Sequence, residues 1–468
     1  MEDLFRLTAR EVVDGLRRGD IKPEEALDAS CKRIEAVDGA LNALPTLCVE
    51  RAYDAAKNLK PSDHVGRLAG LPIVVKDLTE VKGVRTTFGS TLFADHVPTR
   101  SDPLVERLEG RGAVVLAKSN TPEFGAGANT FNEVFGKTVN PWDTTKTCGG
   151  SSGGSAVALA SGQAWLATGS DLGGSLRTPA AFCSVVGLRP SLGRVPRAPN
   201  PAFCETLWTE GPMARNVGDV GLLLDSMSGE DMRVPLSLPE PATPFRISAE
   251  SPCAPKRVAF SRNLGVVPVQ RETADICEQA ALRLQDLGCE VDEACIDFTG
   301  AREIFQTLRA AGFATRFAPM LKTRRDDLKP EVVWNIEKGL ALTAEEIGQA
   351  ERGRAKLFER TLKFFETYDV LVCPTATVAP FDVNIRYIDT IEGEKLDTYI
   401  DWIAITFVVT LTGCPVVSLP CGFTKDGLPV GMQMIGKPKE DAALLSQAAA
   451  AEALFDIAKL VPLDPVTK

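Results

Sequence analysis

The sequence predicts an α/β fold, and two patterns indicate it. Segments with helical spacing alternate with short strand-like segments along the chain, as in proteins whose helices pack on a sheet. The strand-like segments are continuous apolar runs, such as LAGLPIVVKDL at residues 68–78, which is typical of strands buried on both faces. The chain has 468 residues, of which 44% are hydrophobic and 24% charged, the values of an ordinary globular protein.

The first 65 residues are expected to form helices. Thr8 and Glu11 have the spacing of a capping box at the start of one helix. Pro23 begins a second predicted helix, and Gly39 is expected to follow its end.

Residues 66–235 are expected to hold the centre of the sheet. The apolar run 68–78 predicts a buried strand that ends at Lys76. A helix from Asp102 then leads into a strand that ends near Lys118. Two further helices are predicted here, at 156–160 and 217–229.

Residues 236–255 are rich in proline and serine, which predicts a surface connection. The alternation of helices and strands then resumes over residues 256–468. The elements predicted there are a strand at 256–263, a helix stopped by Gly288, a mostly helical stretch at 300–368, a strand at 369–381, a hairpin of 414–423 with 426–436, and a helix at 440–455.

The charge pattern excludes several classes of partner. The formal net charge is −10 and the pI about 5.1, without a basic stripe, so we expect no direct binding of nucleic acid. No apolar run approaches the roughly 20 residues of a membrane span. The N-terminal segment is acidic and helical in pattern, unlike a signal peptide, so we expect a cytoplasmic protein without membrane contact.

Metal and disulfide chemistry are not expected either. The twelve cysteines include no C-x-x-C pair, and several lie in apolar runs, which favours reduced cysteines of the core. His64 and His96 are the only histidines, too few for a clustered zinc site. We therefore expect no metal and no organic cofactor.

Two clusters of glycine and serine stand close together, GGSSGGS at 149–155 and DLGGSLR at 171–177. A phosphate-binding P-loop is excluded because no lysine follows the glycines. The bare G-x-S-x-G match around Ser151 is unlike a Ser-His-Asp hydrolase, because both histidines precede this serine. An S-x-x-K arrangement is absent as well. If a serine reacts, its base must be another group, or else the clusters are a flexible loop.

A neutral lysine can act as that base if burial lowers its pKa towards neutrality. Lys76 and Lys118 both end buried strands, where the active sites of α/β proteins gather. The ordinary alternative is a lysine that leaves the core for solvent, and the residues alone do not choose between the two. The turn of Leu172, Gly173 and Gly174 can present consecutive N–H groups to an oxyanion, or it is a plain turn.

These residues resemble the amidase signature family. The blocks that match are GLPIVVKDL around Lys76, GGSSGGSA at 149–156, GSDLGGSLRTPAAFCSVVGLRPSLGRV at 169–195 and DGLPVGMQMIG at 426–436. Lys76 and Ser151 are 75 positions apart, and Ser151 and Ser175 are 24 apart, as in the family. The resemblance covers most of the chain and thins from about 236 to 360.

The resemblance implies a single α/β domain over residues 1–468, with a large mixed sheet and helices on both faces. It implies that Lys76 is the base, Ser151 a bridging serine held through a cis peptide, and Ser175 the nucleophile. Lys118 then has a structural role or supports the site from outside it. The further site residues implied are Leu172, Gly173 and Gly174 for the oxyanion hole, and Ser152, Asp171 and Arg177 as supports of the loop.

Two functions are compatible with this resemblance. One is a stand-alone amidase acting on a small organic amide, and the other is the glutaminase subunit of a tRNA-dependent amidotransferase. That subunit usually reads D-T-G-G-S-I-R-Q where this chain has Asp171-Leu172-Gly173-Gly174-Ser175-Leu176-Arg177-Thr178, which favours the stand-alone enzyme. Family members are often homodimers, and nothing in the sequence decides that state.

An apolar or aromatic acyl group is expected rather than a charged one. In this family the substrate pocket is built partly from the variable middle of the chain, so the motifs do not identify the substrate. Six side chains could supply an apolar wall: Phe124, Phe131, Phe203, Trp208, Ile403 and Phe407.

Overall fold

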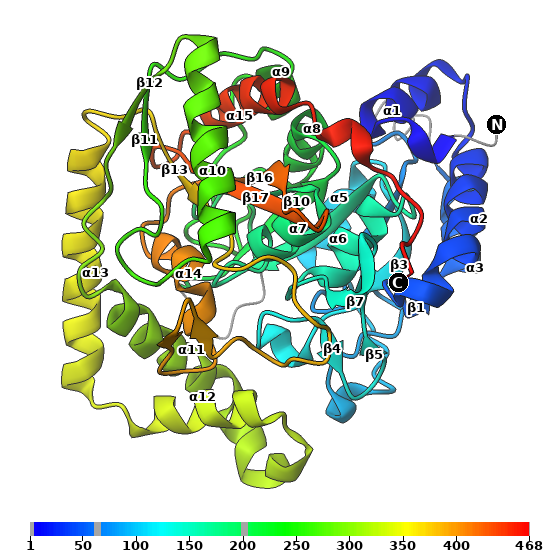
Figure 1. The fold of residues 1–468 in the computed structure, drawn as a ribbon. Coiled ribbons are helices and arrows are strands. Elements are labelled where there is room, and N and C mark those ends of the chain that lie inside the picture. The colour runs from blue at the N-terminus through cyan, green and yellow to red at the C-terminus, as the bar shows by residue number, and fades with distance from the viewer. Residues whose placement is uncertain (1–3, 60–66, 198–204, 468) are drawn as a thin grey trace.

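The computed structural model describes residues 4–59, 67–197 and 205–467, and a mixed eleven-stranded sheet forms its centre (Figure 1). In spatial order the strands are β1 (Thr46–Leu47), β3 (Val114–Ser119), β2 (Pro72–Lys76), β8 (Leu166–Asp171), β10 (Thr209–Ala214), β9 (Val186–Arg189), β16 (Val416–Phe423), β17 (Pro429–Ile435), β13 (Val370–Pro374), β11 (Arg257–Phe260) and β12 (Glu290–Glu293).

Parallel pairs lie towards both ends of the sheet and antiparallel pairs in its middle. Strands β3, β2 and β8 run parallel to one another, as do β13, β11 and β12. Every pair from β8 through β10, β9, β16 and β17 to β13 is antiparallel. The predicted hairpin of 414–423 with 426–436 is the pair β16–β17. The α/β prediction, with one large mixed sheet, is confirmed.

The sheet is covered on both faces because its strands are apolar on both. On β2, Ile73 and Val75 join one core cluster and Val74 joins another, as side-chain alternation along a strand requires. Helices packed on the first face are α1 (Ala9–Arg18), α5 (Pro103–Gly110), α8 (Val217–Met227), α9 (Phe245–Ala249), α10 (Arg271–Arg283) and α15 (Asp441–Phe455). Helices on the second face are α2 (Pro23–Leu41), α3 (Val49–Lys57), α6 (Gly153–Ala160), α7 (Arg177–Cys183), α11 (Ala301–Arg324), α13 (Ala344–Phe364) and α14 (Ala404–Thr410).

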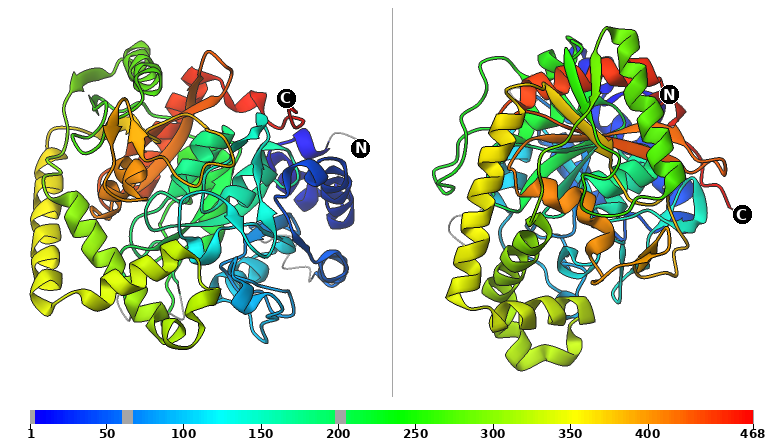
Figure 2. Two further views of the ribbon diagram at one scale, coloured as in Figure 1. Left: turned by 60° about the horizontal axis from the view of Figure 1, so that its bottom comes forward. Right: turned by 60° about the vertical axis from the view of Figure 1, so that its left-hand side comes forward.

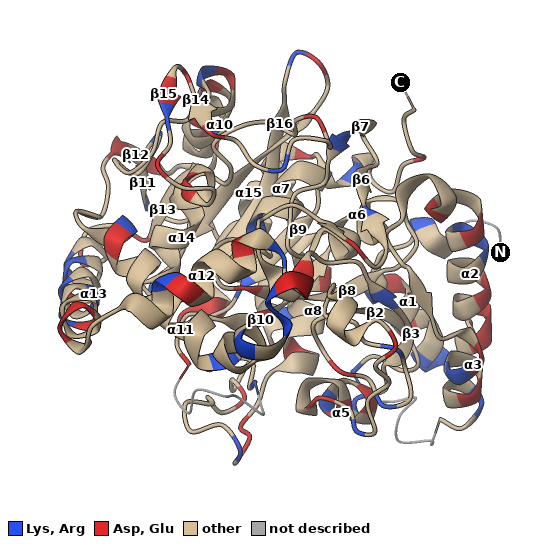
Figure 3. Cartoon of the chain, turned by 90° about the horizontal axis from the view of Figure 1, so that it is seen from below, with Lys and Arg blue, Asp and Glu red and all other residues tan. Residues whose placement is uncertain are grey.

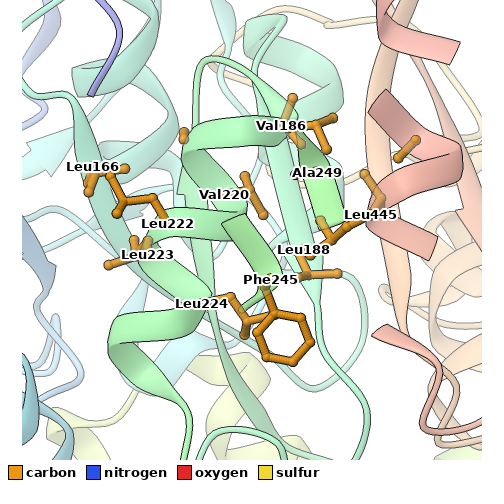
Figure 4. Close-up of a cluster of buried hydrophobic side chains, with 14 of the residues drawn as sticks. Leu166, Val186, Leu188, Val220, Leu222, Leu223, Leu224, Phe245, Ala249 and Leu445 are labelled. Carbon is orange, nitrogen blue, oxygen red and sulfur yellow. The ribbon is translucent and has the colours of Figure 1, made fainter. Parts of the chain in front are cut away.

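Part of the segment expected as a surface connection is in the core. Residues 245–249 form α9, and Phe245 is 1% exposed. Figure 4 shows Phe245 beside Leu224 of α8, among the leucines and valines that line this face of the sheet. The proline-rich composition indicated a loop correctly on either side of α9, but the burial of Phe245 fixes one helical turn within it.

Local signals placed several helices well and missed some ends. The capping box of Thr8 and Glu11 is present at the start of α1. Helix α2 starts at Pro23 as predicted but continues through Gly39 to Leu41. Helix α6 starts at Gly153, three residues before the predicted start. The first turn of α6 itself packs closely on other backbone, since a Cβ on Gly154 would lie 2.4 Å from the N of Asn120.

The predicted helical stretch 300–368 is confirmed as α11, α12 (Pro330–Ala341) and α13. Figures 1 and 2 show α13 running along the outer side of the molecule, with α11 and α12 between it and the N-terminal half. Charged residues of both signs alternate along α13 and α3, whereas α2 is mostly acidic (Figure 3). Three two-stranded hairpins complete the structure: β4 (Phe131–Asn132) with β5 (Gly136–Lys137), β6 (Val139–Asn140) with β7 (Asp143–Thr147), and β14 (Thr390–Ile391) with β15 (Glu394–Lys395).

Candidate active site

Lys76 ends strand β2 with its side chain buried among serine hydroxyls. The residue has no exposed surface, and strand alternation places it on the same face as Val74, towards α6. Its Nζ lies within hydrogen-bond distance of three oxygens: Ser151 Oγ at 2.7 Å, Ser152 Oγ at 2.9 Å and Ser170 Oγ at 3.0 Å. The structure thus brings together Lys76 and Ser151, two of the three residues to which the resemblance assigns catalysis.

The first serine cluster forms a tight turn between β7 and α6. The Gly150–Ser151 peptide bond is cis, as the resemblance implied. Thr130 Oγ1 donates to the carbonyl of Gly149 at 2.8 Å, which fixes the turn from the outside. Ser151 and Ser152 are 2% and 0% exposed, so their hydroxyls are available to Lys76 and to the adjoining cavity rather than to bulk water.

The second cluster follows β8 and carries Ser175. Strands β2 and β8 are parallel, so their carboxyl ends, with Lys76 and Asp171, meet at one edge of the sheet. The N–H of Ser152 donates to the carbonyl of Ser175 at 3.2 Å, which holds the two clusters together. Ser175 is half-buried and lines the same cavity as Ser151 and Ser170.

Burial sets the proton affinity of Lys76. It lowers the pKa of the ammonium from 10.5 to about 7, although the carboxylates of Glu210 and Asp171 act in the opposite direction. A lysine with that pKa is neutral in a substantial fraction of molecules near pH 7. Lys76 can therefore accept a proton from a serine hydroxyl, which an ordinary surface lysine cannot do.

The carboxylate of Asp171 holds the second cluster in place through hydrogen bonds and ion pairs. Its carboxylate is fully buried and accepts from Arg177 Nε and Nη2, both at 3.0 Å, and from Arg189 Nη1 at 3.3 Å. Burial alone would raise the pKa of Asp171, but the two guanidinium groups hold it well below its usual range. Arg177 also donates to the carbonyl of Thr406, which ties the turn to α14.

The backbone N–H groups of the turn at Leu172–Gly174 differ in whether the protein itself supplies an acceptor. The N–H of Gly174 donates to Asp171 Oδ1 at 2.9 Å, so in this structure it is not free for a substrate. The N–H groups of Leu172 and Gly173 have no acceptor within the described chain, and both residues line the cavity. Gly174 has a φ of +122°, a conformation that glycine adopts readily and other residues do not.

The cavity beside Ser175 is mostly apolar. Of the predicted wall, Phe124, Trp208 and Ile403 line it, whereas Phe407 stacks behind them on Phe305 at 4.2 Å. Phe131 lies under Lys329 and is not part of the lining. Phe203 falls outside the described residues. The lining also contains seven residues that sequence reasoning missed: Gly125, Gly127, Ala128, Ser170, Arg309, Phe313 and Ile400.

Lys118, the second lysine at the end of a buried strand, has other partners. Its Nζ donates to Asp77 Oδ1 at 3.0 Å and to Thr86 Oγ1 at 2.9 Å, and both Lys118 and Asp77 are buried. This ion pair stabilises the loop that follows β2. The structural role that the resemblance left for Lys118 agrees with these contacts.

Glu210 is a further missed residue. It lies on β10 directly opposite Ser170 of β8, is 5% exposed, and accepts from Trp208 Nε1 at 2.9 Å. Its Oε2 has no hydrogen-bond partner. Neither Glu210 nor Ser170 belongs to the two glycine clusters, but the alternation of β8 could have shown that Thr168 and Ser170 share a face.

Other kinds of site are absent from the described ranges. Residues 4–59, 67–197 and 205–467 hold no group of three or more histidine, cysteine or acidic side chains arranged to hold a metal ion. Within the same ranges, no helix is both long and apolar enough to cross a membrane.

Comparison with known proteins finds relatives over nearly the whole chain. The family model described as Amidase matches residues 25–445. An acylamidase of Rhodococcus erythropolis is 33% identical over 470 residues, which cover 99% of this chain and 98% of the relative. The A subunit of the glutamyl-tRNA(Gln) amidotransferase of Moorella thermoacetica is 35% identical over 479 residues, covering 96% and 97% of the two chains.

A solved structure shares the whole fold. The crystal structure of a bacterial aryl acylamidase of the amidase signature family superposes with a TM-score of 0.89 at 28% identity, over 98% of this chain and 99% of that one. These similarities extend over nearly the whole chain, and they agree with a fold that brings a buried lysine and two glycine-serine turns together. The chain therefore belongs to the amidase signature family and is an amide C–N hydrolase.

Proposed function

We propose that this protein is a stand-alone amidase that hydrolyses a small organic carboxamide to a carboxylic acid and ammonia or an amine. The observation that carries the proposal is the set of short contacts between the buried Nζ of Lys76 and the hydroxyls of Ser151, Ser152 and Ser170. A lysine with a pKa of about 7 beside a serine relay supplies a base without histidine.

In the proposed reaction, Ser175 is the nucleophile. Neutral Lys76 takes the proton of Ser151 while Ser151 takes that of Ser175, and Ser175 Oγ attacks the amide carbon. The N–H groups of Leu172 and Gly173, together with that of Ser175, stabilise the oxyanion, because they are the donors not engaged within the protein. Gly174 holds the turn through Asp171.

The second half of the reaction returns the protons. Collapse of the tetrahedral intermediate breaks the C–N bond, and the leaving nitrogen takes a proton relayed from Lys76 through Ser151. Water then attacks the acyl-enzyme with the same relay as base, which releases the carboxylic acid and restores Ser175. No group outside this set is needed to balance the protons.

The alternative is a glutaminase subunit of a tRNA-dependent amidotransferase. The relative from Moorella thermoacetica belongs to that class, so similarity alone does not separate the two functions. The cavity does favour one of them. Leu172, at the position where that subunit usually has threonine, lines the cavity with Ile403, Phe313 and Phe124, an apolar surface suited to an organic acyl or aryl group.

The proposal is tested with a fluorophosphonate probe on the purified chain. We expect covalent modification of Ser175, located by peptide mass mapping, and loss of that modification in Lys76→Ala. A screen of neutral amides should then give turnover that Ser175→Ala abolishes in a folded protein. Modification of Ser175 that requires a second protein, or glutamine-dependent ammonia release only with such a partner, would favour the amidotransferase subunit instead.

A further inference from the structure

Arg309 places a buried positive charge in the catalytic cavity. The residue belongs to α11, is 4% exposed, and lines the cavity with Phe313, Leu172 and Ser175. It is the one charged side chain among the lining residues that the structure describes. The reaction proposed above gives it no task.

The protein supplies hydrogen-bond acceptors for only some of the N–H groups of Arg309. Nη1 donates to Asn335 Oδ1 and Nη2 donates to the hydroxyl of Tyr399 at 2.8 Å, two of the five N–H groups of a guanidinium. The guanidinium also lies 4.7 Å from the centre of the Phe313 ring. Both oxygen acceptors are uncharged, so these contacts orient the side chain without neutralising it.

No carboxylate of the described chain forms an ion pair with Arg309. Asn335 donates to the backbone carbonyl of Glu331, whose carboxylate pairs with Arg386 at 2.7 Å. Asp401 receives the N–H of Thr398 and pairs with Arg302 at 3.1 Å. Asp401 reaches α11 through Gln306, not through Arg309. The segment 198–204, whose placement is not described, contains no acidic residue.

Three of the other four buried arginines of the described chain have a carboxylate partner. Arg177 and Arg189 pair with Asp171, and Arg194 pairs with Asp441. The remaining one is Arg215, which lies outside the cavity and donates to the carbonyls of Phe5 and Leu7. A buried cation is unfavourable unless hydrogen bonds or an anion compensate it, and Arg309, unlike Arg215, lines a cavity in which a ligand can supply that anion.

We propose that the substrate carries a carboxylate on an otherwise apolar body, and that Arg309 binds this carboxylate. The proposal rests on the proposed amidase activity and narrows its substrate class. A guanidinium matches the planar carboxylate with parallel hydrogen bonds, and the aromatic and aliphatic lining fits the remainder of the molecule. The expectation of an uncharged acyl group is thereby replaced by a group that is apolar along its length and anionic at its end.

The first experiment uses the wild-type enzyme and matched pairs of amides. Each pair has an apolar chain of graded length that ends either in a carboxylate or in an uncharged isopropyl group of similar shape. One series carries this chain on the acyl side and a second carries it on the amine side. We expect kcat/KM to favour the carboxylate by roughly 10- to 100-fold at the best length in one of the series, the value of a charge-assisted hydrogen bond.

The second experiment removes or replaces the charged side chain of Arg309. Arg309→Met should reduce the carboxylate preference to near unity, and Arg309→Lys should retain part of it because lysine keeps the charge but not the planar donor pair. Tyr399→Phe is the matched control. It removes the acceptor of Nη2 and leaves the guanidinium in place, so the carboxylate preference should persist even if overall activity falls.

Competition covers the case in which Arg309→Met fails to fold. Against hydrolysis of a neutral amide by the wild-type enzyme, the diacid of best length should inhibit competitively and at least tenfold more tightly than the monoacid of that length. Equal kcat/KM within every pair, or equal inhibition by diacid and monoacid, overturns the role of Arg309. The proposed function fails separately, if Ser175 is not labelled and neutral amides are not hydrolysed.

Discussion

Glu210 of β10 lies directly opposite Ser170 of β8, and Ser170 Oγ lies 3.0 Å from the Nζ of Lys76. Side chains of opposite residues on an antiparallel pair share one face, so the carboxylate of Glu210 adjoins the hydroxyl that contacts the lysine. Burial raises the pKa of Glu210, and Arg197 and Lys76 both act to lower it. The charge of Glu210 in turn raises the pKa of Lys76 against the effect of burial.

Replacing Glu210 should therefore shift the pH dependence of the enzyme. Glu210→Gln removes a negative charge, so the pKa of Lys76 falls and the acid limb of the kcat/KM profile moves to lower pH by about 1 to 2 units. The measurement is a pH–rate profile with a neutral amide. Glu205→Gln is the control, since Glu205 pairs with Arg316 and not with the serines. An unmoved or raised acid limb in Glu210→Gln would show that the two groups do not interact.

Lys76 should also affect the stability of the fold. Its pKa is about 7 in the folded protein and about 10.4 in an unfolded chain. Between these pH values the unfolded chain binds the proton and the folded chain does not, so the free energy of unfolding rises with pH over that range. Below pH about 7 both states are protonated, and the full destabilising effect of the buried ammonium is present.

Lys76→Met should flatten that dependence. We expect the difference in unfolding free energy between wild type and variant to change by a few kcal/mol between pH about 7 and pH about 10. Urea denaturation at the two ends of the range measures it. Parallel curves for the two proteins across the range would mean that Lys76 is charged in the folded state at neutral pH.

Gly174 should not accept a side chain. A Cβ there would lie 2.3 Å from Thr406 Oγ1, at a φ of +122°. Gly174→Ala should lower kcat/KM by about 100-fold or more, because the turn that carries the backbone donors must shift. Gly413→Ala is the matched control, since Gly413 also has a positive φ, +67°, but nothing lies within 4 Å of its Cβ position. The control should lose stability of about 1 kcal/mol and keep its turnover.

The carboxylate of Asp171 should be essential for stability. Asp171→Asn leaves two buried guanidinium groups without their counter-charge, which should lower the free energy of unfolding by about 3–5 kcal/mol. Glu345→Gln, which breaks the exposed pair of Glu345 with Arg352, should change it by about 0.5 kcal/mol or less. Similar midpoints of denaturation for the two variants would contradict this assignment.

The part of the site that could be predicted from sequence is the part built by short-range pattern. The apolar run before Lys76 fixes a buried strand and its end, and the glycines around Ser151 and Ser175 mark tight turns. From these patterns alone, Lys76 and Lys118 were equivalent. The contacts distinguish them, because Lys118 pairs with Asp77 whereas Lys76 contacts serine hydroxyls.

The rest of the site depends on tertiary packing. Arg309 and Phe313 come from α11, in the region where motif similarity thins, and they reach the cavity only because α11 packs across the second face of the sheet. Gly39 and Phe245 illustrate the same limit in the fold. A helix continues past the exposed Gly39 because Leu41 beyond it is buried, and a turn of helix forms in a proline-rich segment because Phe245 is buried.

Helix α11 and strands β2 and β8 hold different parts of this site. Lys76 and the serines near it are held by the sheet and its two turns. Arg309 and Phe313 are carried on a helix for which no backbone hydrogen bond to these strands or turns is found in the described chain. Such an arrangement makes the scaffold evolvable. Substitutions along one face of α11 should change the shape and charge of the cavity while Lys76 and the serine turns keep their positions.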